Sequence, residues 1–418
     1  MKKLIISFIL STSVALLQLP VSFDVYAADA PKAEKKKRKV YLPGPSVGKK
    51  VGKAFEAYTA DDLDGAIAIL EDIKAKKEYD IVFVNFFTGQ MYAQKGDSPK
   101  SISYLSKALK PDMLSEADQG NGLRLLADLQ MQEKQYKSAI SNYKAWMDFT
   151  GKSEGNVWVK VSQAYSELNQ YANAISPANQ AIAAYGDKHN QNPYLLKLRS
   201  YFERKMFNES VSVLETAVQI FPETKQFWIQ LGSFYAMVEN YPQSMATLDL
   251  AYKQGFLDKE SQIKMLSSLY AQSEMPFRSA LLLEKYIGSG LVKRDDQNVA
   301  TLANTWHAAK NIGKAAKYYG ELAKMTNEAK HYSKQGTLLA QDEQFKKAVV
   351  ALSKAVDLGA KNKGRLYMGI AESHFYLGQY KQAYAAINQA MKDPKTRKSA
   401  RGWKSFIKDT AQRKGKSI

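Results

Sequence analysis

The stretch from Trp228 to Ala251, WIQLGSFYAMVENYPQSMATLDLA, indicates the fold class of this chain. It contains two segments with the apolar spacing of amphipathic helices. Each segment carries one small residue, Gly232 in the first and Ser244 in the second. Two antiparallel helices approach closely only where the side chains at their crossing are small, while large apolar side chains fill the surrounding space. The stretch therefore predicts a tightly packed antiparallel helix pair.

The same arrangement recurs along the chain from residue 47 onward. The second-helix crossing residue is Ala or Ser in ten units, at intervals of 33 to 38 residues: Ala66, Ser101, Ala139, Ala174, Ser210, Ser244, Ser279, Ala315, Ala348 and Ala383. Twelve residues earlier stands the first-helix crossing residue, which is large only at Leu198: Ala54, Gly89, Ala127, Ser162, Leu198, Gly232, Ser267, Ala303, Gly336 and Ala371. This regularity predicts ten stacked helix pairs.

Aromatic side chains flank the crossing residues, as this packing requires. They stand three residues after the first-helix crossing residue in six units: Tyr92, Tyr165, Tyr201, Tyr235, Tyr270 and Trp306. With a period of about 34 residues, the pattern resembles the tetratricopeptide repeat. One unit matches the family's positions almost one for one, with Trp228, Leu231, Gly232, Tyr235, Ser244, Leu248 and Ala251. The resemblance implies an all-α, right-handed superhelical solenoid of about ten helix-turn-helix repeats over residues 47–395.

The last residues have a different composition. Residues 396–418 are rich in Lys and Arg and also contain Trp403, Phe406 and Ile407. Terminal units of a solenoid need a polar outer face for solubility. We therefore expect a basic capping helix followed by a tail.

The net charge of +19, from 60 Lys and Arg against 41 Asp and Glu, is concentrated at the two ends of the chain. Residues 32–53 and 392–418 each sum to +8, so residues 54–391 carry only +3. A nucleic-acid-binding protein more usually has a basic stripe interleaved with aromatic residues on its folded face. We expect no nucleic-acid partner, and we expect the basic ends to suit an anionic envelope surface or an acidic protein.

The first 27 residues have the organisation of a secretory signal peptide. Lys2 and Lys3 precede an apolar run, and small residues near Ala27 form a cleavage site. The alternative is an uncleaved anchor over Leu4–Phe23, which is just long enough to span a bilayer. No later stretch approaches 18 apolar residues, so we expect a periplasmic chain without a transmembrane segment after cleavage. Residues 28–46 are expected to be a disordered basic linker.

Within this linker lies a basic arm that consists of Lys35, Lys36, Lys37, Arg38 and Lys39. Such a run also resembles a nuclear-import signal. Because an export signal precedes it, we interpret it as a solvated arm, which would be attracted to anionic lipid, cell-wall polymer or an acidic protein.

Residues that carry catalytic chemistry are scarce. The chain has no cysteine, which excludes thiolate catalysis, disulfides and Cys-based zinc sites. Its four histidines, His189, His307, His331 and His374, leave little material for a His-rich metal centre, and His307 has no second histidine or carboxylate at ligand spacing. The segment from Gly44 to Lys50 resembles a phosphate-binding loop, but it has three residues between its glycines and lacks the Ser or Thr that binds magnesium. We expect no enzyme activity, no cofactor and no metal site.

The tetratricopeptide resemblance implies that the first helices line a groove for an extended peptide or a partner helix. The predicted groove residues are amides, which both donate to and accept from a peptide backbone: Gln90, Gln94, Gln163, Gln226, Gln272, Gln297, Asn304 and Gln341. A solvated polar face is the alternative for the glutamines. Asn121, Asn156 and Asn192 either join the groove or cap their helices.

One further segment resembles a narrower group of proteins. Val40–Tyr58 reads VYLPGPSVGKKVGKAFEAY and is followed by Asp61, Asp62 and Ala66. It is similar to the start of the exported tetratricopeptide proteins that accompany TonB-type energy-transduction systems in marine gammaproteobacteria. The resemblance implies a non-catalytic periplasmic scaffold, accessory to TonB-dependent uptake of iron or other nutrients. Its partners would be a TonB-like transducer, the motor proteins of that transducer, or an outer-membrane receptor.

Two other functions stay open from the sequence. A periplasmic scaffold for polysaccharide export or envelope assembly would use the same groove. A cell-wall-binding protein would instead use the basic ends on anionic polymer.

Overall fold

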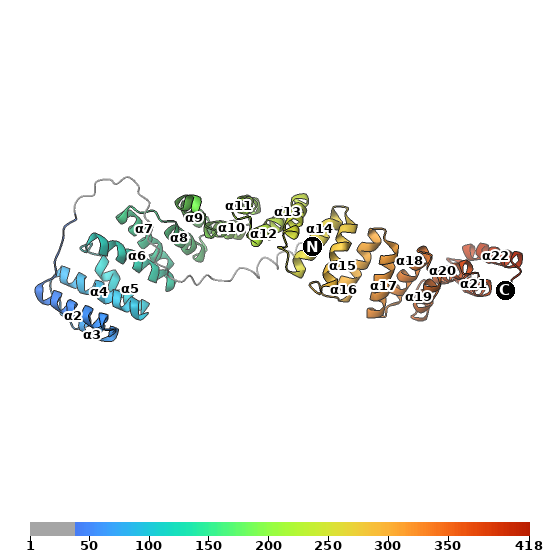
Figure 1. Cartoon of the computed structure of the whole chain (residues 1–418), viewed down its shortest axis with the longest axis horizontal. Helices are drawn as coiled ribbons and strands as arrows, with labels where there is room; N and C mark the ends of the chain where they lie inside the picture. The colour runs from blue at the N-terminus through green and yellow to red at the C-terminus, as the bar shows by residue number, and fades with distance from the viewer. Residues whose placement is uncertain (1–37) are drawn as a thin grey trace. The chain divides into compact units, whose positions relative to one another are not determined.

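The computed structural model describes residues 38–418, and this part of the chain is helical throughout, without a strand. The predicted signal peptide (1–27), most of the predicted linker and three residues of the basic arm, Lys35, Lys36 and Lys37, lie outside the described residues. The helices form ten antiparallel pairs and one final helix (Figure 1). The prediction of an all-α tetratricopeptide-type solenoid is confirmed. None of the described helices is both long enough and apolar enough to cross a membrane.

The chain divides into two compact units, and the division falls after Phe227. Unit 1 contains repeats 1 to 5, whose helices are α2 (Pro45–Thr59), α3 (Leu63–Glu71), α4 (Glu78–Lys95), α5 (Ser98–Leu109), α6 (Glu116–Gln132), α7 (Tyr136–Thr150), α8 (Gly155–Glu167), α9 (Tyr171–Tyr185), α10 (Asn192–Glu203) and α11 (Phe207–Ile220). A short 3-10 turn, η2 (Gly186–Lys188), follows α9.

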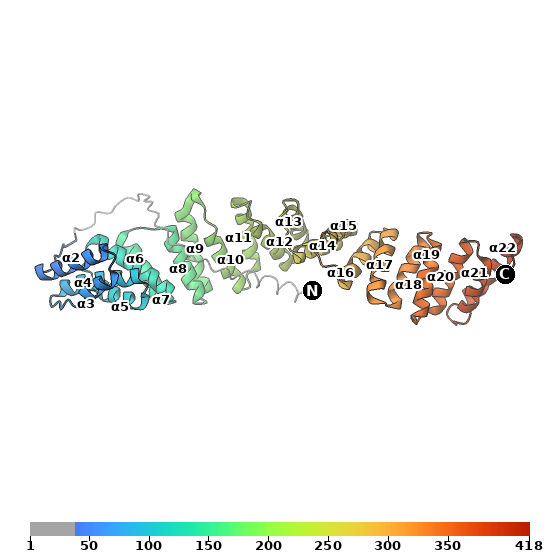
Figure 2. The ribbon, with the colours of Figure 1, turned by 60° about the horizontal axis from the view of Figure 1, so that its bottom comes forward.

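Unit 2 contains repeats 6 to 10, and Figure 2 shows their helices pairing in antiparallel fashion. They are α12 (Lys225–Met237), which begins just before the division, α13 (Tyr241–Lys253), α14 (Glu260–Gln272), α15 (Pro276–Gly288), α16 (Asp296–Ala308), α17 (Ile312–Thr326), α18 (Ala329–Gln341), α19 (Phe345–Asp357), α20 (Lys363–Tyr376) and α21 (Tyr380–Ala390). The last helix is α22 (Arg397–Arg413).

The crossing residues inferred from the sequence are the points of closest approach within each pair. All ten second-helix crossing residues are at most 1% exposed. At Ser101, Ser244 and Ser279 the hydroxyl bonds across the crossing, whereas the Ser210 hydroxyl donates to the Met206 carbonyl four residues earlier. The Ser244 hydroxyl donates to the backbone carbonyl of Gly232 at 2.7 Å, and Ser101 makes the same bond to Gly89 at 2.7 Å. These bonds satisfy the hydroxyls that the close approach buries.

Each of the three glycines at a first-helix crossing, Gly89, Gly232 and Gly336, faces a leucine. A Cβ at Gly232 would lie 2.5 Å from Cγ of Leu248, and a Cβ at Gly336 would lie 2.6 Å from Cγ of Leu352. Such distances are shorter than any non-bonded carbon contact, so these two leucines fill the volume that a methyl group would need.

Each pair is closed by a residue in the left-handed backbone region, seven residues after the first-helix crossing residue. These ten turn residues have φ between +56° and +81°: Asp61, Gly96, Lys134, Asn169, Lys205, Glu239, Glu274, Lys310, Glu343 and Gly378. The N–H of the following residue donates to a carbonyl five residues back, as Asn240 does to Tyr235 at 2.8 Å. This is the Schellman-type ending that satisfies the last carbonyls of a helix.

Tyrosines of two first helices also tie their repeats to the preceding ones. The Tyr92 hydroxyl donates to the Glu71 carboxylate of α3 at 2.7 Å, and the Tyr270 hydroxyl donates to Asp249 of α13. Burial, followed by the hydrogen bond to Glu71, raises the pKa of Tyr92 to about 12. The tyrosines therefore stay neutral donors across the physiological pH range.

Helix α22 covers the end of unit 2 by packing against α21. Ile407 is completely buried and Trp403 is partly buried, as expected for the packed side of a cap. Phe406 differs from that expectation because it is 47% exposed, with its ring 5.1 Å from the ring of Phe375. The C-terminal cap thus leaves an aromatic edge open to solvent.

The segment before α2 differs from the linker that we expected over residues 28–46. Helix α2 begins at Pro45, and residues 38–44 form an N-terminal strap against unit 1. The Arg38 guanidinium donates to the Leu114 carbonyl at 2.7 Å and to the Asp112 carboxylate at 2.6 Å. Its carbon Cζ lies 5.0 Å from the centre of the Phe149 ring. Arg38 is therefore not part of a solvated arm, because a carbonyl, a carboxylate and a ring hold it.

The close crossing predicts that Gly336→Ala destabilises the chain. The added methyl group meets both Cγ and the backbone nitrogen of Leu352, so the helices must separate, at a cost of about 1–3 kcal/mol. The midpoint of urea unfolding, followed by circular dichroism, measures this loss. Gly402→Ala is the matched control, because no atom lies within 4 Å of a Cβ there, and it should gain up to about 1 kcal/mol. If both variants gained the same stability, the close contact between Gly336 and Leu352 would not limit the side chain at this crossing.

Candidate protein-binding groove

The first helices of the pairs lie on the inner side of each unit. Neighbouring first helices approach one another directly, as α2 does with α4, α8 with α10 and α18 with α20. Among the described helices, no two neighbouring second helices approach one another to the same extent. In a stack of pairs, the side on which neighbours come closer is the concave one. We call the exposed surface of the first helices the inner face.

The predicted groove amides occupy three equivalent positions of the first helix. Gln90, Gln163 and Asn304 follow the crossing residue directly, Gln94, Gln272 and Gln341 stand five residues after it, and Gln226 and Gln297 stand six residues before it. Gln90 and Gln163 are half-buried and the other six are exposed. Four of the eight precede the division after Phe227 and four follow it.

Two of these amides are engaged within the chain. The Gln272 amide donates to the Ser268 hydroxyl at 3.0 Å, and the Asn304 oxygen accepts from the Tyr319 hydroxyl. A partner that binds at these two positions has to compete with intramolecular hydrogen bonds.

None of the three uncertain asparagines caps its helix. Ser115 caps α6 through a bond from the Asp118 amide, so Asn121 lies inside that helix. Helices α8 and α10 begin without a side-chain cap, with Asn156 and Asn192 in their first turns. The capping alternative is therefore wrong for these residues.

Ion pairs between neighbouring repeats cross the inner face of unit 1. Arg124 of α6 pairs with Glu154 at 2.6 Å, and Asp128 of α6 pairs with Lys160 of α8 at 2.7 Å. A third pair joins Glu167 of α8 to Arg199 of α10 at 2.8 Å. The sequence analysis did not predict these three ion pairs, because it considered only amide side chains at the inner positions. Alignment of the repeats would have shown Asp128 and Arg199 at the same position as Gln90 and Gln163.

Asp128 joins the inner face to the core of repeat 3. Its carboxylate accepts hydrogen bonds from Lys160 and from the hydroxyl of the buried Tyr143. Burial, and then the charge of Asp128, raise the pKa of Tyr143 above its ordinary value of 10.0. The inner face of unit 1 is thus held by its own polar network, with each charge about one-third exposed.

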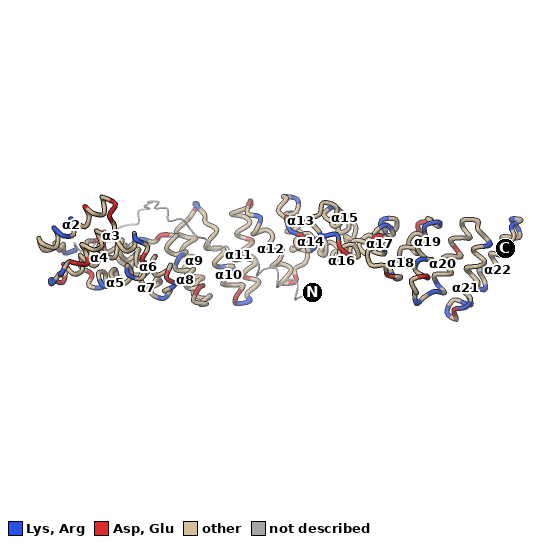
Figure 3. The backbone as a smooth tube through the Cα atoms, turned by 90° about the horizontal axis from the view of Figure 1, so that it is seen from below, with Lys and Arg blue, Asp and Glu red and all other residues tan. Residues whose placement is uncertain are grey.

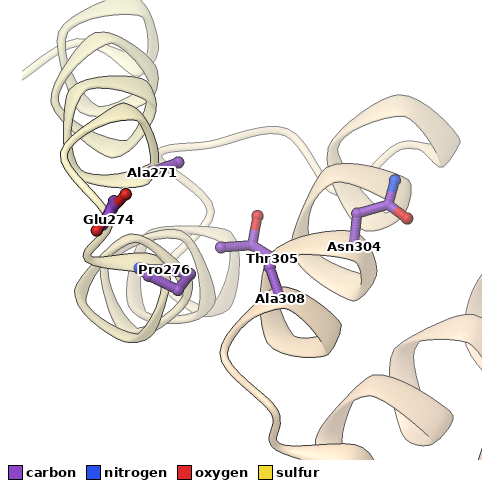
Figure 4. A pocket seen from close by; sticks show the side chains of 6 residues that line it. All are labelled: Ala271, Glu274, Pro276, Asn304, Thr305 and Ala308. Atoms are coloured by element: carbon purple, nitrogen blue, oxygen red, sulfur yellow. The ribbon is translucent and has the colours of Figure 1, made fainter.

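Two recesses lie on the inner face of unit 2. The first, the α14–α16 pocket, has a volume of about 460 Å³ and is lined by Ala271, Glu274, Pro276, Asn304, Thr305 and Ala308. Figure 4 shows Thr305 directed toward Ala271 and Pro276, whereas the Asn304 amide points away from Glu274. The walls of this pocket are therefore small and mostly apolar, with one carboxylate at the rim.

The second recess, the α18–α20 pocket, has a volume of about 310 Å³. It is lined by Ala340, Gln341, Glu343, Phe345, Glu372 and Tyr376. Its positions repeat those of the first pocket two repeats later. Glu343 corresponds to the turn residue Glu274, and Phe345 corresponds to Pro276. The two pockets share a backbone framework and differ in chemistry.

A basic region lies between the two pockets along the first helices. It consists of His307 on α16, the turn residue Lys310 and Lys334 on α18. Burial, followed by the charges of Lys334 and Lys310, lowers the pKa of His307 below its ordinary value of 6.5. Its imidazole is therefore neutral at pH 7. Figure 3 shows that both signs of charge are interspersed along the described chain, so this basic region is local.

The other histidines are spread along the chain, and His331 lies in the first turn of α18. His374 lies near the end of α20, with Nδ1 2.6 Å from the Gln379 side-chain oxygen, and His189 lies after η2. Within residues 38–418, no group of three or more His, Asp or Glu side chains is arranged to hold a metal ion.

The network around Asp128 predicts different effects for two substitutions. Asp128→Ala leaves the buried Tyr143 hydroxyl and the Lys160 ammonium without their acceptor, and it should lower the free energy of unfolding by about 1–3 kcal/mol. Asp128→Asn keeps an oxygen for Tyr143 and loses only a partly exposed ion pair, so we expect a loss below about 1 kcal/mol. Urea unfolding of both variants measures the difference. Equal losses would show that the Tyr143 hydrogen bond does not contribute.

The chain is similar to several solved structures at low sequence identity. No protein-family model and no curated protein matches the sequence. Among solved structures, the C-terminal part of a TPR repeat-containing protein from Cytophaga hutchinsonii is 15% identical, with a TM-score of 0.37 over 58% of this chain and 98% of that one. The Naa15/Naa10 complex bound to HypK-THB is 13% identical, with a TM-score of 0.45 over 86% of this chain and 66% of that one. YrrB, described as a TPR protein with an unusual peptide-binding site, is 16% identical, with a TM-score of 0.34 over 44% of this chain and 93% of that one.

Proposed function

We propose that the chain is a non-catalytic scaffold that binds partner proteins through the inner faces of its two units. The observation that carries this proposal is the pair of equivalent pockets on the inner face of unit 2. A stack of helix pairs offers a long surface whose backbone is already satisfied, so its exposed side chains are available for recognition. Recesses at the same register of different repeats suit a partner that runs along that surface.

We further propose that the scaffold is exported to the periplasm and serves a TonB-dependent uptake system. The signal-peptide pattern of residues 1–27 and the resemblance of Val40–Tyr58 support this assignment. In the structure, that segment supplies most of the N-terminal strap and nearly all of α2. After cleavage of residues 1–27, the chain would reach such a system through its binding surfaces, because none of the described helices could cross a membrane. Pro-rich or acidic periplasmic segments of a transducer, of its motor proteins or of a receptor suit a polar groove and basic ends.

In-cell crosslinking with a C-terminally tagged chain tests the assignment. We expect enrichment of a TonB-like transducer, its motor subunits or an outer-membrane receptor in iron-starved cells relative to iron-replete cells. The intact mass of the recovered protein tests export in the same experiment, because a mature chain should begin near Ala28. A tagged chain without residues 1–27 is the control for contacts formed outside the periplasm.

Two outcomes would contradict the TonB assignment. Capture of polysaccharide-export or murein-synthesis proteins, with no transducer in either condition, would favour a general envelope scaffold. Cosedimentation with purified peptidoglycan, together with no captured protein, would favour a cell-wall-binding role.

The basic arm provides a separate prediction. Replacement of Lys35, Lys36, Lys37 and Lys39 by Gln, with Arg38 retained, should weaken cosedimentation with vesicles that contain phosphatidylglycerol at low salt and leave stability unchanged. Arg38→Gln is the matched variant, and it should instead lower the stability of unit 1 because the strap loses its contacts. Unchanged binding in the lysine variant would show that the arm does not contribute to recruitment.

A further inference from the structure

The α18–α20 pocket combines an exposed aromatic pair with two carboxylates. The rings of Phe345 and Tyr376 stack at 4.9 Å with an interplanar angle of 17°, and Tyr376 is 58% exposed. Glu343 and Glu372 line the same recess. Among the described residues, no salt bridge or side-chain hydrogen bond joins either glutamate to another group. The recess therefore has two carboxylates that form no ion pair within the described residues.

Elsewhere in the chain, two arginines are each bound by an aromatic ring and a carboxylate, the same two kinds of group that line this pocket. Arg38 lies over the Phe149 ring at 5.0 Å and donates to the Asp112 carboxylate at 2.6 Å. Arg124 lies over the Trp146 ring at 5.0 Å and donates to Glu154 at 2.6 Å. In both cases the face of the guanidinium contacts a ring while its edge donates to a carboxylate, which are the two interactions that this planar group makes best.

We propose that the α18–α20 pocket binds an arginine side chain carried by an extended segment of a partner protein. The inference rests on the proposed function, since it takes the inner face as the binding surface, and it adds the chemistry of the partner. Glu343 and Glu372 supply charge complementarity, and the exposed ring of Tyr376 supplies a stacking face. Lysine fits less well, because its ammonium cannot stack or donate as a planar fork.

The α14–α16 pocket provides a control within the same unit. It has the same backbone positions and one carboxylate, Glu274, but Pro276 and Ala308 stand where Phe345 and Tyr376 stand in the other pocket. It therefore lacks the stacking face and the second carboxylate, and we expect it to bind arginine weakly or not at all.

Saturation-transfer NMR on the full exported chain tests the proposal, with N-acetyl-arginine amide as the probe. N-acetyl-citrulline amide, which has nearly the same shape and no charge, is the matched ligand. We expect saturation transfer to the arginine probe and little to the citrulline probe. Tyr376→Leu and the Glu343→Gln/Glu372→Gln double variant should each raise the apparent dissociation constant about two- to fivefold or more. Glu274→Gln should leave it unchanged.

Several results would overturn the proposal. The first is equal saturation transfer to both probes. The second is an unchanged affinity for the arginine probe in the Glu343→Gln/Glu372→Gln double variant. The third is a loss of affinity in Glu274→Gln as large as that in the double variant. A synthetic peptide of residues 28–39 tests another occupant. If it binds in a Glu343- and Glu372-dependent manner and more tightly than an unrelated peptide with one arginine, the occupant is the chain's own basic arm. Because this test uses purified protein, its outcome is independent of whether in-cell crosslinking identifies a TonB-type partner.

Discussion

The distance between two helix backbones at the crossing residues determines most of this structure. Small side chains at Gly232 and Ser244, and a hydroxyl-to-carbonyl bond of 2.7 Å between them, allow a close approach that leaves no room for a methyl group. That approach decides where the facing leucine lies and where the chain must turn. Each turn sets the direction of the next helix. Repetition of this geometry places the first helices of successive pairs side by side, and their exposed surface is the inner face.

The same constraint explains how much of the fold could be predicted. Close packing tolerates few residue types, so small residues twelve apart identified the pairs. The cap was identified by its composition, in which Trp403, Phe406 and Ile407 stand among many Lys and Arg residues. The N-terminal strap could not be found this way. Arg38 belongs to a run of basic residues that is ordinarily solvated, and its partners Asp112 and Leu114 lie more than seventy residues away. Nothing in the local sequence indicates that contact.

The inner face was predictable by position but not by chemistry. Periodicity placed Gln163 and Asn304 on the exposed side of their helices, yet the charged row of Asp128, Lys160 and Arg199 occupies the same surface in unit 1. The recesses were harder to predict than the face itself. A recess depends on the side-chain volumes of a first helix, of the turn that follows it and of the next first helix. As a result, the two pockets have equivalent backbone positions but different side chains. For example, Pro276 lines the first pocket where Phe345 lines the second.

The turn residues carry a consequence for how such a chain diverges over time. The bond that closes each pair uses backbone atoms only, so the side chain at the turn is not constrained by the core. A non-glycine residue there costs about 1–2 kcal/mol of backbone energy, and the chain carries lysine, glutamate, aspartate or asparagine at eight of the ten turns. In unit 2 the series reads Glu239, Glu274, Lys310, Glu343 and Gly378, and Glu274 and Glu343 border the pockets. New binding preferences can therefore evolve by single substitutions along this edge while the solenoid beneath it stays the same.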